Sequence, residues 1–396
     1  MENQSRPGPR LTRRAAFGLA AGGLLLPGVV RAAGRQADHA ALDSMAAKLV
    51  ADHRVPGLSI SLSRAGQLIY SKGFGWANLE TGTLVTPKTI FKIGSNTKNF
   101  TAAAILLLQE EGRLSVDDRL ARFFPDFPRA ADVSLRQLLT HTAGLGNYTR
   151  VRPPREFFQV ARRDYDADAL YALMKGTEPL YLFEPGAGWE YSNTGYVLLG
   201  LIVQQVTAEP YGAYFKRRLF EPAGMKDTAV DDAAEVVVNR ASGYSAHPGS
   251  DTTFDNASYI SMTYPGGAGA LRSTTDDLCR WRAALFGGRI VNAASLKAMI
   301  TPARLKDGSQ PMTGSGSERS PINYGFGLLI DVVNGRACIR HTGHINGFQS
   351  ELRTFPDEQV TYAFLSNIDN FDRGRPRQSE INALTAAASR AGLAHG

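Results

Sequence analysis

In the stretch Thr89-Ile90-Phe91-Lys92-Ile93-Gly94-Ser95-Asn96-Thr97-Lys98, a strand-like segment leads into the start of an amphipathic helix. Residues three positions apart share one face of a helix, with Cβ atoms about 5–6 Å apart, so Lys98 can place its amine beside the Ser95 hydroxyl. A serine becomes a good nucleophile when an adjacent base takes its proton, and a lysine with a lowered pKa can be that base. The pattern predicts a nucleophile and its partner; the alternative is a solvated helix start capped by Ser95.

Two triplets far downstream supply further polar groups. Tyr191-Ser192-Asn193 follows Ser95 by 96 residues, and His341-Thr342-Gly343 follows Tyr191 by another 150. The longer phrases around them are Leu138-Leu139-Thr140-His141-Thr142-Ala143-Gly144-Leu145, Gly195-Tyr196-Val197-Leu198-Leu199-Gly200, Phe220-Glu221-Pro222-Ala223-Gly224-Met225 and Tyr324-Gly325-Phe326-Gly327. The order of the triplets is more specific than any one of them, because each alone recurs by chance.

On these residues the chain resembles the serine β-lactamase and penicillin-binding superfamily, most closely its branch of class C β-lactamases, serine D-Ala-D-Ala carboxypeptidases and related esterases. The likeness covers roughly residues 40–370. It implies that Ser95 is acylated, that Lys98 tunes the site, and that Tyr191 acts as general base and then as general acid. A phenol with an ordinary pKa of about 10 can do this near neutral pH only if a cation favours its phenolate. Lys98 is the expected cation, so Lys98 and Tyr191 are predicted to titrate as a coupled pair.

The resemblance also implies donors for the oxyanion that develops during attack on a carbonyl. These are the backbone N–H groups of Ser95 and His344, which do not depend on side-chain identity. Asn193 offers an amide that is expected to orient Lys98 and to contact a substrate carbonyl. The side chain of His344 is expected to face solvent.

The third triplet begins at the last residue of a segment, Ala337–His341, that is predicted to be an edge strand beside the catalytic groups. Substrate is expected to lie along this edge, contacting His341 and Thr342, with Gly343 letting its backbone approach closely. Many β-lactamases of the resembled superfamily carry a lysine in place of His341, and that cation helps to bind the carboxylate of a penicillin. Histidine is mostly neutral above pH 6.5, so the exchange favours the carboxypeptidase-like and esterase-like branches. A structural histidine is the alternative for His341.

Residues outside the triplets give weaker signals. Arg272 and Arg340 are candidates for the missing positive charge, with a solvated surface arginine as the more ordinary reading of each. His141 is predicted to be structural and to fix a turn near the site. No third ligand cluster accompanies His341 and His344, so no metal is expected. No dinucleotide fingerprint occurs, and no cofactor is expected.

The first residues of the chain differ in kind from the rest. Thr12-Arg13-Arg14-Ala15-Ala16-Phe17 leads into an apolar run, Ala15–Val30, that is rich in glycine and alanine. This pattern predicts a twin-arginine export signal over residues 1–33, cleaved after Ala32 or Ala33, and a periplasmic or secreted bacterial protein. A retained spanning helix is the weaker alternative, because the run is short and broken by glycines and a proline. No stable membrane anchor is expected after cleavage.

Composition limits the remaining possibilities. A chain of 396 residues with 43% hydrophobic and 20% charged residues can bury one large catalytic unit of two lobes. The net charge of +7 falls to about +3 without the signal, which holds five arginines and one glutamate, so no nucleic-acid partner is expected. Cys279 and Cys338 are the only cysteines; a disulfide between them is possible but not indicated.

Strand-like segments occur near both ends of the chain, with helical periodicity between them. The predicted strands are 58–63, 68–74, 325–332, 337–341, 349–354 and 361–366. The predicted helices are 37–53, 96–111, 133–139, 167–175, 194–206 and 379–391. With the resemblance, this pattern predicts an α/β (α+β) fold of the β-lactamase/transpeptidase-like type.

In that fold, residues 34–396 form one catalytic domain. An antiparallel sheet flanked by helices is built from about 37–94 and 324–392, an all-helical lobe is inserted between them, and the catalytic groups meet at the junction. The irregular segments 150–163 and 241–264 are expected to border the site and to set specificity. Residues 305–322 are expected to form a flexible surface loop.

The leading hypothesis is an exported serine hydrolase that acts through an acyl-enzyme on small esters, β-lactams or D-amino-acid peptides. A peptidoglycan D-Ala-D-Ala carboxypeptidase or a D-aminopeptidase is the alternative within this class, so the expected partner is a small-molecule or peptidoglycan-derived substrate. A catalytically silent binding protein that keeps the fold is the alternative from another class. The presence of every polar group that the mechanism needs argues against it. The sequence does not predict the oligomeric state.

Overall fold

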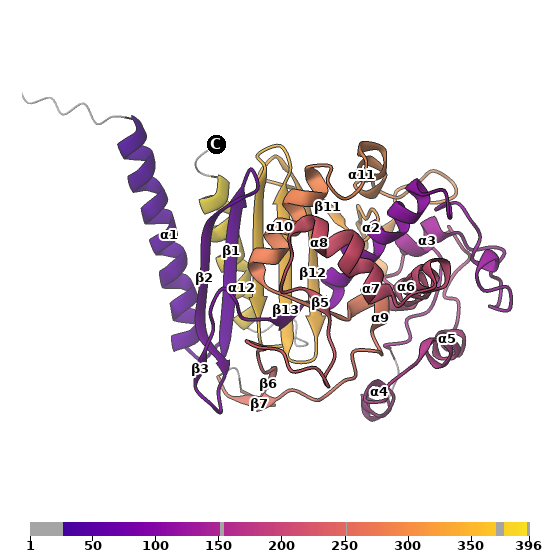
Figure 1. The fold of residues 1–396 in the computed structure, drawn as a ribbon, viewed down its shortest axis with the longest axis horizontal. Helices are drawn as coiled ribbons and strands as arrows, with labels where there is room; N and C mark the ends of the chain where they lie inside the picture. Colours follow the sequence, from indigo (N-terminus) through magenta and orange to yellow (C-terminus); the bar gives the residue numbers. More distant parts are fainter. Residues whose placement is uncertain (1–26, 151–153, 251, 370–375, 394–396) are drawn as a thin grey trace, which may run out of the picture.

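A computed structural model describes residues 27–150, 154–250, 252–369 and 376–393, and shows a sheet with covering helices beside a lobe of further helices (Figure 1). The predicted export signal, residues 1–33, lies outside the described residues except for 27–33, which begin α1 (Pro27–Ala51). Its cleavage stays a prediction. No helix in the described ranges is both long enough and apolar enough to span a bilayer.

The sheet has seven strands in antiparallel order, and both ends of the chain contribute to it, as predicted. In spatial order the strands are β11 (Leu329–Val333), β12 (Arg336–Ile345), β13 (Phe348–Phe355), β14 (Val360–Ser366), β1 (Gly57–Arg64), β2 (Gln67–Asn78) and β3 (Thr83–Leu84). The expected strand at 325–332 starts only at Leu329. Gly327 has a φ of +70°, which turns the chain before the strand begins.

The helices divide between the sheet and the lobe. Against the sheet lie α1, α12 (Pro376–Leu393) and α10 (Thr275–Phe286). The other helices are α2 (Thr97–Glu110), α3 (Leu135–Leu139), α4 (Pro154–Ala161), α5 (Ala167–Lys175), α6 (Asn193–Thr207), α7 (Tyr211–Phe215), α8 (Glu221–Ala223), α9 (Gly266–Gly269) and α11 (Ala293–Met299). Single turns η1 (Gly94–Asn96), η2 (Leu120–Arg122), η3 (Lys216–Phe220) and η4 (Gly316–Glu318) complete the helical elements of the described ranges.

Strand β1 shows how the sequence holds helices on both faces of the sheet. Successive side chains of a strand point to opposite faces, and Leu58, Ile60 and Leu62 pack with residues of α1 and α12. The serines between them face α10, where Ser61 Oγ donates to Thr275 Oγ1 at 2.8 Å. The region between the two sheet segments of the chain was expected to form only the helical lobe, but it also supplies α10 to the sheet.

The inserted region is also not wholly helical. It contains short strands that the sequence pattern did not reveal, because segments of two or three residues are too short for a visible period. Of these, β8 (Leu271–Ser273) and β5 (Ala229–Val230) form a three-stranded sheet with β4 (Phe91–Lys92), which lies in the predicted strand-like stretch 89–94. The others form a ribbon of β6 (Tyr244–Ala246) and β7 (Phe254–Asn256), and a ribbon of β9 (Met312–Thr313) and β10 (Ser320–Pro321).

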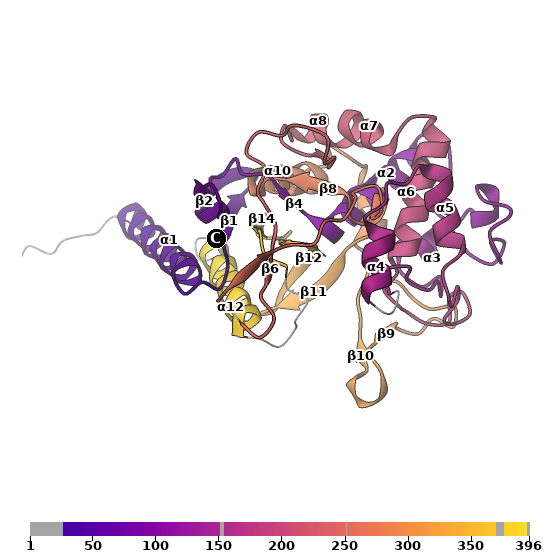
Figure 2. The same cartoon turned by 90° about the horizontal axis from the view of Figure 1, so that it is seen from below.

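The segments expected to be irregular contain regular structure. Residues 154–161 of the first segment form α4, and the second segment carries the β6–β7 ribbon. Residues 305–322, expected to be a loop, include the β9–β10 ribbon, which projects from the lobe in Figure 2.

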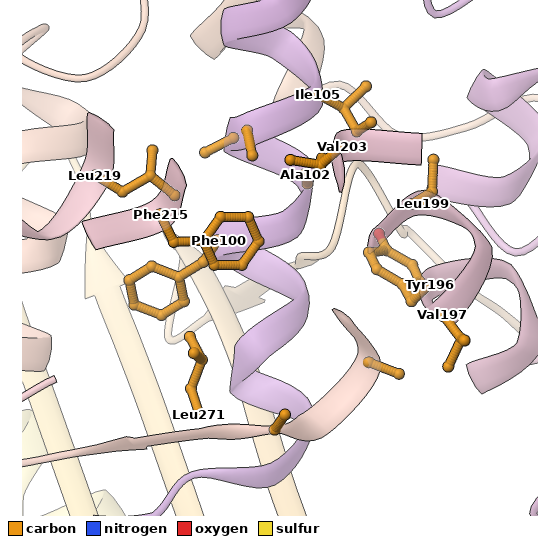
Figure 3. Packing of buried hydrophobic residues seen from close by; sticks show 14 of the residues in the cluster. Phe100, Ala102, Ile105, Tyr196, Val197, Leu199, Val203, Phe215, Leu219 and Leu271 are labelled. Carbon is orange, nitrogen blue, oxygen red and sulfur yellow. The ribbon is translucent and has the colours of Figure 1, made fainter. Parts of the chain in front are cut away.

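Helix α2 is the centre of the core rather than an amphipathic surface helix. Every residue from Thr97 to Leu108 is buried, which is the behaviour of a helix enclosed on all sides. Figure 3 shows Phe100, Ala102 and Ile105 among side chains of neighbouring elements. Because α2 is fixed on all sides, the residues at its N-terminus are held in a rigid frame.

Both cysteines are buried and free: Cys279 lies in α10 and Cys338 in β12. In the part of the chain that the structure describes, no cluster of three or more histidine, cysteine or acidic side chains is arranged to bind a metal ion.

Candidate active site

Ser95 and Lys98 meet at the junction of η1 and α2, as their spacing predicts. The Lys98 Nζ atom lies 3.2 Å from the Ser95 Oγ atom. Ser95 is partly exposed, whereas Lys98 is fully buried. An accessible hydroxyl is therefore in contact with an amine that solvent does not reach.

The Lys98 amine has two further partners from other elements. It donates to Asn193 Oδ1 at 2.7 Å and to the Ala268 carbonyl at 2.8 Å. All three partners are uncharged, and burial lowers the pKa of Lys98 well below its ordinary value. A neutral amine can donate its two hydrogens to Asn193 and Ala268, which leaves its lone pair directed at the Ser95 hydroxyl.

Tyr191 is also close to Ser95, and the two side chains are hydrogen-bonded. Lys98 Nζ lies 4.8 Å from the centre of the Tyr191 ring, over its face. Burial raises the pKa of Tyr191, and the hydrogen bond with Ser95 only partly offsets this effect. The expectation that Lys98 stabilises a phenolate on Tyr191 differs from this geometry, because the hydrogen-bond partners of the amine are Asn193, Ala268 and Ser95.

Asn193 begins α6 and holds Lys98 through its side-chain carbonyl, as expected. Its Nδ2 atom donates to Thr149 Oγ1 at 3.2 Å. The amide therefore links the lysine to the segment that precedes α4. Thr149 was not predicted, because nothing in its local sequence marks it.

His141 has the structural role that was predicted for it. Its Nδ1 atom accepts a hydrogen bond from the Ser192 N–H at 3.2 Å, and its ring packs against Tyr191 with centroids 4.4 Å apart. Burial lowers the pKa of His141 well below the ordinary value, and Lys98 and His341 add to this effect. A neutral imidazole thus fixes the turn that presents Tyr191.

His341 is 3% exposed and both of its ring nitrogens have partners. Nδ1 lies 2.6 Å from the Thr342 carbonyl, and Nε2 lies 3.0 Å from the Tyr324 hydroxyl. A carbonyl only accepts, so Nδ1 carries the proton and the Tyr324 hydroxyl donates to Nε2. Burial lowers the pKa of His341 to about 3, and Lys98 adds to this effect. His341 is therefore a neutral structural histidine whose two ring nitrogens both have partners within the protein. This is the alternative that was given to the expected substrate contact.

Gly343 and Gly94 allow β12 and η1 to interlock. A Cβ atom at Gly343 would lie 2.0 Å from the Ile93 carbonyl oxygen, so the space beside Gly343 is filled by the protein. The expectation that Gly343 admits a substrate backbone is therefore wrong for this face. Gly94 has a φ of +50°, and a Cβ atom there would lie 3.0 Å from the His344 nitrogen. The backbone of His344, which was predicted to stabilise the oxyanion, therefore lies against Gly94, the residue before Ser95. The side chain of His344 is partly exposed.

A second set of hydrogen bonds holds the turn that carries the nucleophile. Ser350 Oγ donates to the Ile93 carbonyl at 2.7 Å and accepts from Asn96 Nδ2 at 2.8 Å. On the other side, Arg282 Nη2 donates to Asn99 Oδ1 at 2.9 Å, and Asn99 Nδ2 donates to the Asn96 carbonyl at 2.9 Å. Strand β13 and helix α10 therefore both hold the turn that carries Ser95 in place through hydrogen bonds. Only the repeated asparagines at positions 96 and 99 hinted at this in the sequence.

Neither arginine considered for substrate binding presents an uncompensated charge. Arg272 is buried in β8, where its guanidinium pairs with Asp231 at 3.3 Å and with Glu235 at 2.7 Å. It is therefore not the solvated surface arginine that was expected. Arg340 pairs with Asp331 on the neighbouring strand β11.

The sequence did not assign roles to two groups that complete the site. The Ala268 carbonyl, which accepts from Lys98, is a backbone group, so its role cannot be recognised from the residue type. Tyr324 opens one of the phrases around the triplets, and its distance of 17 residues from His341 conceals that the two side chains touch.

Comparison with known proteins places this geometry in context. The model of the Beta-lactamase family matches residues 42–387. Penicillin-binding protein 4* of Bacillus subtilis (strain 168) is 31% identical over 324 residues, which is 78% of this chain and 67% of that protein. Esterase EstB of Burkholderia gladioli is 27% identical over 78% of this chain and 84% of its own length. Protein flp of Staphylococcus aureus matches over only 60% of its length.

Solved structures give the same result. D-amino acid amidase from Ochrobactrum anthropi SV3, complexed with L-phenylalanine amide, has a TM-score of 0.75 at 26% identity, covering 90% of this chain and 98% of that one. The octameric penicillin-binding protein homologue from Pyrococcus abyssi has a TM-score of 0.72 at 28% identity, covering 89% of this chain and 77% of that one. The fold and the order of the triplets therefore agree with the match to the family model.

Proposed function

Because the chain belongs to the Beta-lactamase family of serine hydrolases, we propose that it hydrolyses acyl substrates through a covalent acyl-enzyme on Ser95. The observation that carries the proposal is the contact of 3.2 Å between Lys98 Nζ and Ser95 Oγ, made by an amine whose burial favours its neutral form. The substrate classes considered are small esters, amides including D-amino-acid peptides, and β-lactams. The names of the relatives include an esterase and a D-amino acid amidase, which support the first two, and penicillin-binding proteins, which support the third.

The proposed reaction begins when neutral Lys98 takes the proton of the Ser95 hydroxyl and Oγ attacks the substrate carbonyl. The C–O or C–N bond to the leaving group then breaks, and the leaving group takes a proton from Tyr191. This assignment makes Lys98 the base and Tyr191 the acid, which suits an amine with a lowered pKa and a phenol with a raised one. Proton transfer from Lys98 then restores the phenol, and water completes the cycle by attacking the ester on Ser95.

The developing oxyanion is assigned to the backbone N–H groups of Ser95 and His344. The approach of the His344 peptide to Gly94 supports this assignment, because it brings the two residues to the same side of the turn. Donors fixed by a strand and a buried helix need no reorganisation when charge develops.

The test is mass spectrometry of the intact protein after brief exposure to a p-nitrophenyl ester. We expect one acyl adduct, mapped by peptide digestion to Ser95. Ser95→Ala should form none, whereas Ser309→Ala, at an exposed serine, should acylate like the parent. An unmodified parent protein that still releases p-nitrophenol would contradict an acyl-enzyme.

We also propose that the protein is exported through the twin-arginine signal at Arg13-Arg14. Replacing both arginines by lysine should leave the full-length chain inside the cell, whereas Arg10→Lys should not. Cell fractionation with N-terminal sequencing measures both location and cleavage. Equal export of the double-lysine variant would refute the signal.

A further inference from the structure

Arg282, on α10, is a buried cation of which the contacts described above use only one nitrogen. Its side chain is fully buried, and its Nη2 atom donates to Asn99 Oδ1 at 2.9 Å. The Nε and Nη1 atoms have no hydrogen-bond partner among the residues that the structure describes, and no carboxylate of those residues forms an ion pair with the guanidinium. Most of the N–H donors of this guanidinium are therefore unsatisfied by the described protein.

Arg272 shows what a buried arginine normally requires. Its guanidinium pairs with the carboxylates of Asp231 and Glu235. Burial lowers the pKa of Arg282 to about 9, so its guanidinium still carries a positive charge at neutral pH. Burying a charge without a partner of opposite sign is costly, and unmade hydrogen bonds add to that cost. Arg282 therefore lacks a counter-charge within the described ranges of the chain.

Arg282 lies on the face of α10 that covers the sheet. Thr275 and Cys279 precede it by about two turns and one turn, so the three residues share one side of the helix. Ser61 of β1 donates to Thr275 Oγ1 at 2.8 Å, and its carbonyl accepts from Cys279 Sγ at 3.8 Å. Helix α10 packs against both β1 and β14. The Arg282 side chain, which reaches Asn99 of α2, is thus enclosed by α10, α2 and the sheet.

The sheet presents hydroxyl groups on this same face. Side chains two residues apart on a strand point to one face, so Ser63 shares the face of Ser61. Ser63 pairs with Thr361 of β14, which pairs in turn with Thr354 of β13. All three side chains are buried, and the hydroxyls of Thr354 and Thr361 lie 3.1 Å apart. One hydroxyl of such a pair donates to the other, which keeps its own hydrogen for a further acceptor.

We propose that Arg282 binds one small monovalent inorganic anion, of which chloride is the model, between α10 and the sheet. The anion accepts hydrogen bonds from Nε and Nη1 and cancels the charge of the guanidinium. Close packing of a helix on a sheet excludes a larger anion such as phosphate. A halide accepts hydrogen bonds from several directions, which suits donors that come from a helix and from strands. This anion site is independent of the proposed acyl-enzyme.

The first test measures urea unfolding of the full chain in sodium chloride and in sodium gluconate at equal ionic strength. Gluconate is too large to enter the core, so it is the reference anion. Chloride is titrated up to about 0.15 M, the physiological ionic strength. The equilibrium constant for folding should rise about twofold when chloride equals its dissociation constant, and about tenfold at ten times that concentration, because one anion binds the folded state.

Arg282→Met separates this gain from the general effects of the two salts on stability. The variant keeps a long side chain but has no guanidinium, so it should show no gain that is specific to chloride. Arg289→Met is the matched control at an exposed arginine, and it should keep the whole gain. A response to chloride that is the same in the parent and in Arg282→Met would overturn the proposal.

The second test needs no variant and decides the question if Arg282→Met does not fold. Crystals of the parent protein are grown in sodium bromide, because bromide can replace chloride and scatters X-rays anomalously. We expect an anomalous peak within hydrogen-bonding distance of Arg282 Nε and Nη1. A water molecule at these atoms, or bromide at other positions only, would refute the anion site.

Discussion

Lys92 and Lys98 are six residues apart, and both lysines are removed from most solvent contact, yet their surroundings have opposite character. Lys92, in β4, lies 3.9 Å from Asp231, a carboxylate that also pairs with Arg240 at 3.1 Å and with Arg272. Lys98, in α2, has only uncharged partners. Burial lowers the pKa of both amines, but the Asp231 carboxylate opposes this effect at Lys92, and no such opposing cause acts on Lys98.

The difference shows that burial alone does not make a lysine reactive. A carboxylate partner keeps a buried amine charged and therefore unable to accept a proton. With neutral partners the amine loses its charge more easily, and its lone pair can then accept a proton. The ion-paired region around Asp231 stabilises a junction of short strands, and the neutral region around Lys98 is suited to proton transfer.

The largest expected effect comes from exchanging each lysine for methionine. Lys98→Met removes the proposed base and leaves Asn193 and Ala268 without their donor, so kcat/KM for a p-nitrophenyl ester should fall by about 10⁴-fold. Lys92→Met should change it by less than about threefold, because Arg240 and Arg272 still neutralise Asp231. Steady-state kinetics measure kcat/KM for both variants. Equal losses would contradict the assignment of Lys98, and not Lys92, as the base.

Tyr191→Phe should have the next largest effect, a loss of about 10³-fold, because it removes a hydroxyl that only the neutral region uses for proton transfer. The loss should be smaller for a p-nitrophenyl ester, whose leaving group needs little protonation, than for an alkyl ester. Tyr171→Phe, at a phenol that donates to Asp126 far from Ser95, is the matched control. Equal losses for the two kinds of ester would argue that Tyr191 is not the acid.

Ser350→Ala is expected to lower kcat/KM by about tenfold and the free energy of unfolding by about 1–3 kcal/mol, because the Ile93 carbonyl and the Asn96 amide lose a buried partner. The effect should appear in kcat more than in KM, since the turn that carries Ser95 loses its support. Urea unfolding and kinetics separate the two quantities. Ser245→Ala, which removes the bond to Asp369, should lower stability without a loss in kcat.

The smallest effect concerns pH and stability. His341 has a pKa lowered to about 3 in the folded protein, against about 6.5 in the unfolded chain, so the unfolded state binds the extra proton as pH falls below 6.5. Stability should therefore decrease from pH 7 toward pH 5 by up to about 1.4 kcal/mol per pH unit for this group. His341→Gln should flatten the slope measured by urea unfolding, and an unchanged slope would contradict a neutral His341. His141 contributes in the same direction.

The large elements and the three triplets were predictable because they carry long periods or a specific order. Strands such as β1 and β14 and helices such as α2 and α6 were placed within a few residues. The contact of Ser95 with Lys98 was predicted from their spacing on one helix. The role of His141 in fixing a turn was predicted from the residues around it in the sequence.

Other features of the site depend on tertiary contacts that no local pattern encodes. The ordinary pKa rules suggested a phenolate on Tyr191, yet the partners that determine the charge of Lys98 include the backbone of α9 and the start of α6. Gly343 was correctly expected to allow a close approach, but the approaching group is Ile93 rather than substrate. The short strands β5 and β8 near Asp231 were missed because segments of two or three residues show no visible period.

The contacts of β12 and β13 with the turn that carries Ser95 have a consequence for biosynthesis. Ser95 leaves the ribosome early, but Gly343 and Ser350, which hold its turn, are made some 250 residues later. A nascent chain truncated before β13 carries the Ser95–Lys98 pair and the helices α1–α11, but it lacks Ser350, which holds the turn. Competence for acyl transfer should therefore arise at the end of translation, so the unfinished polypeptide is protected from premature acylation.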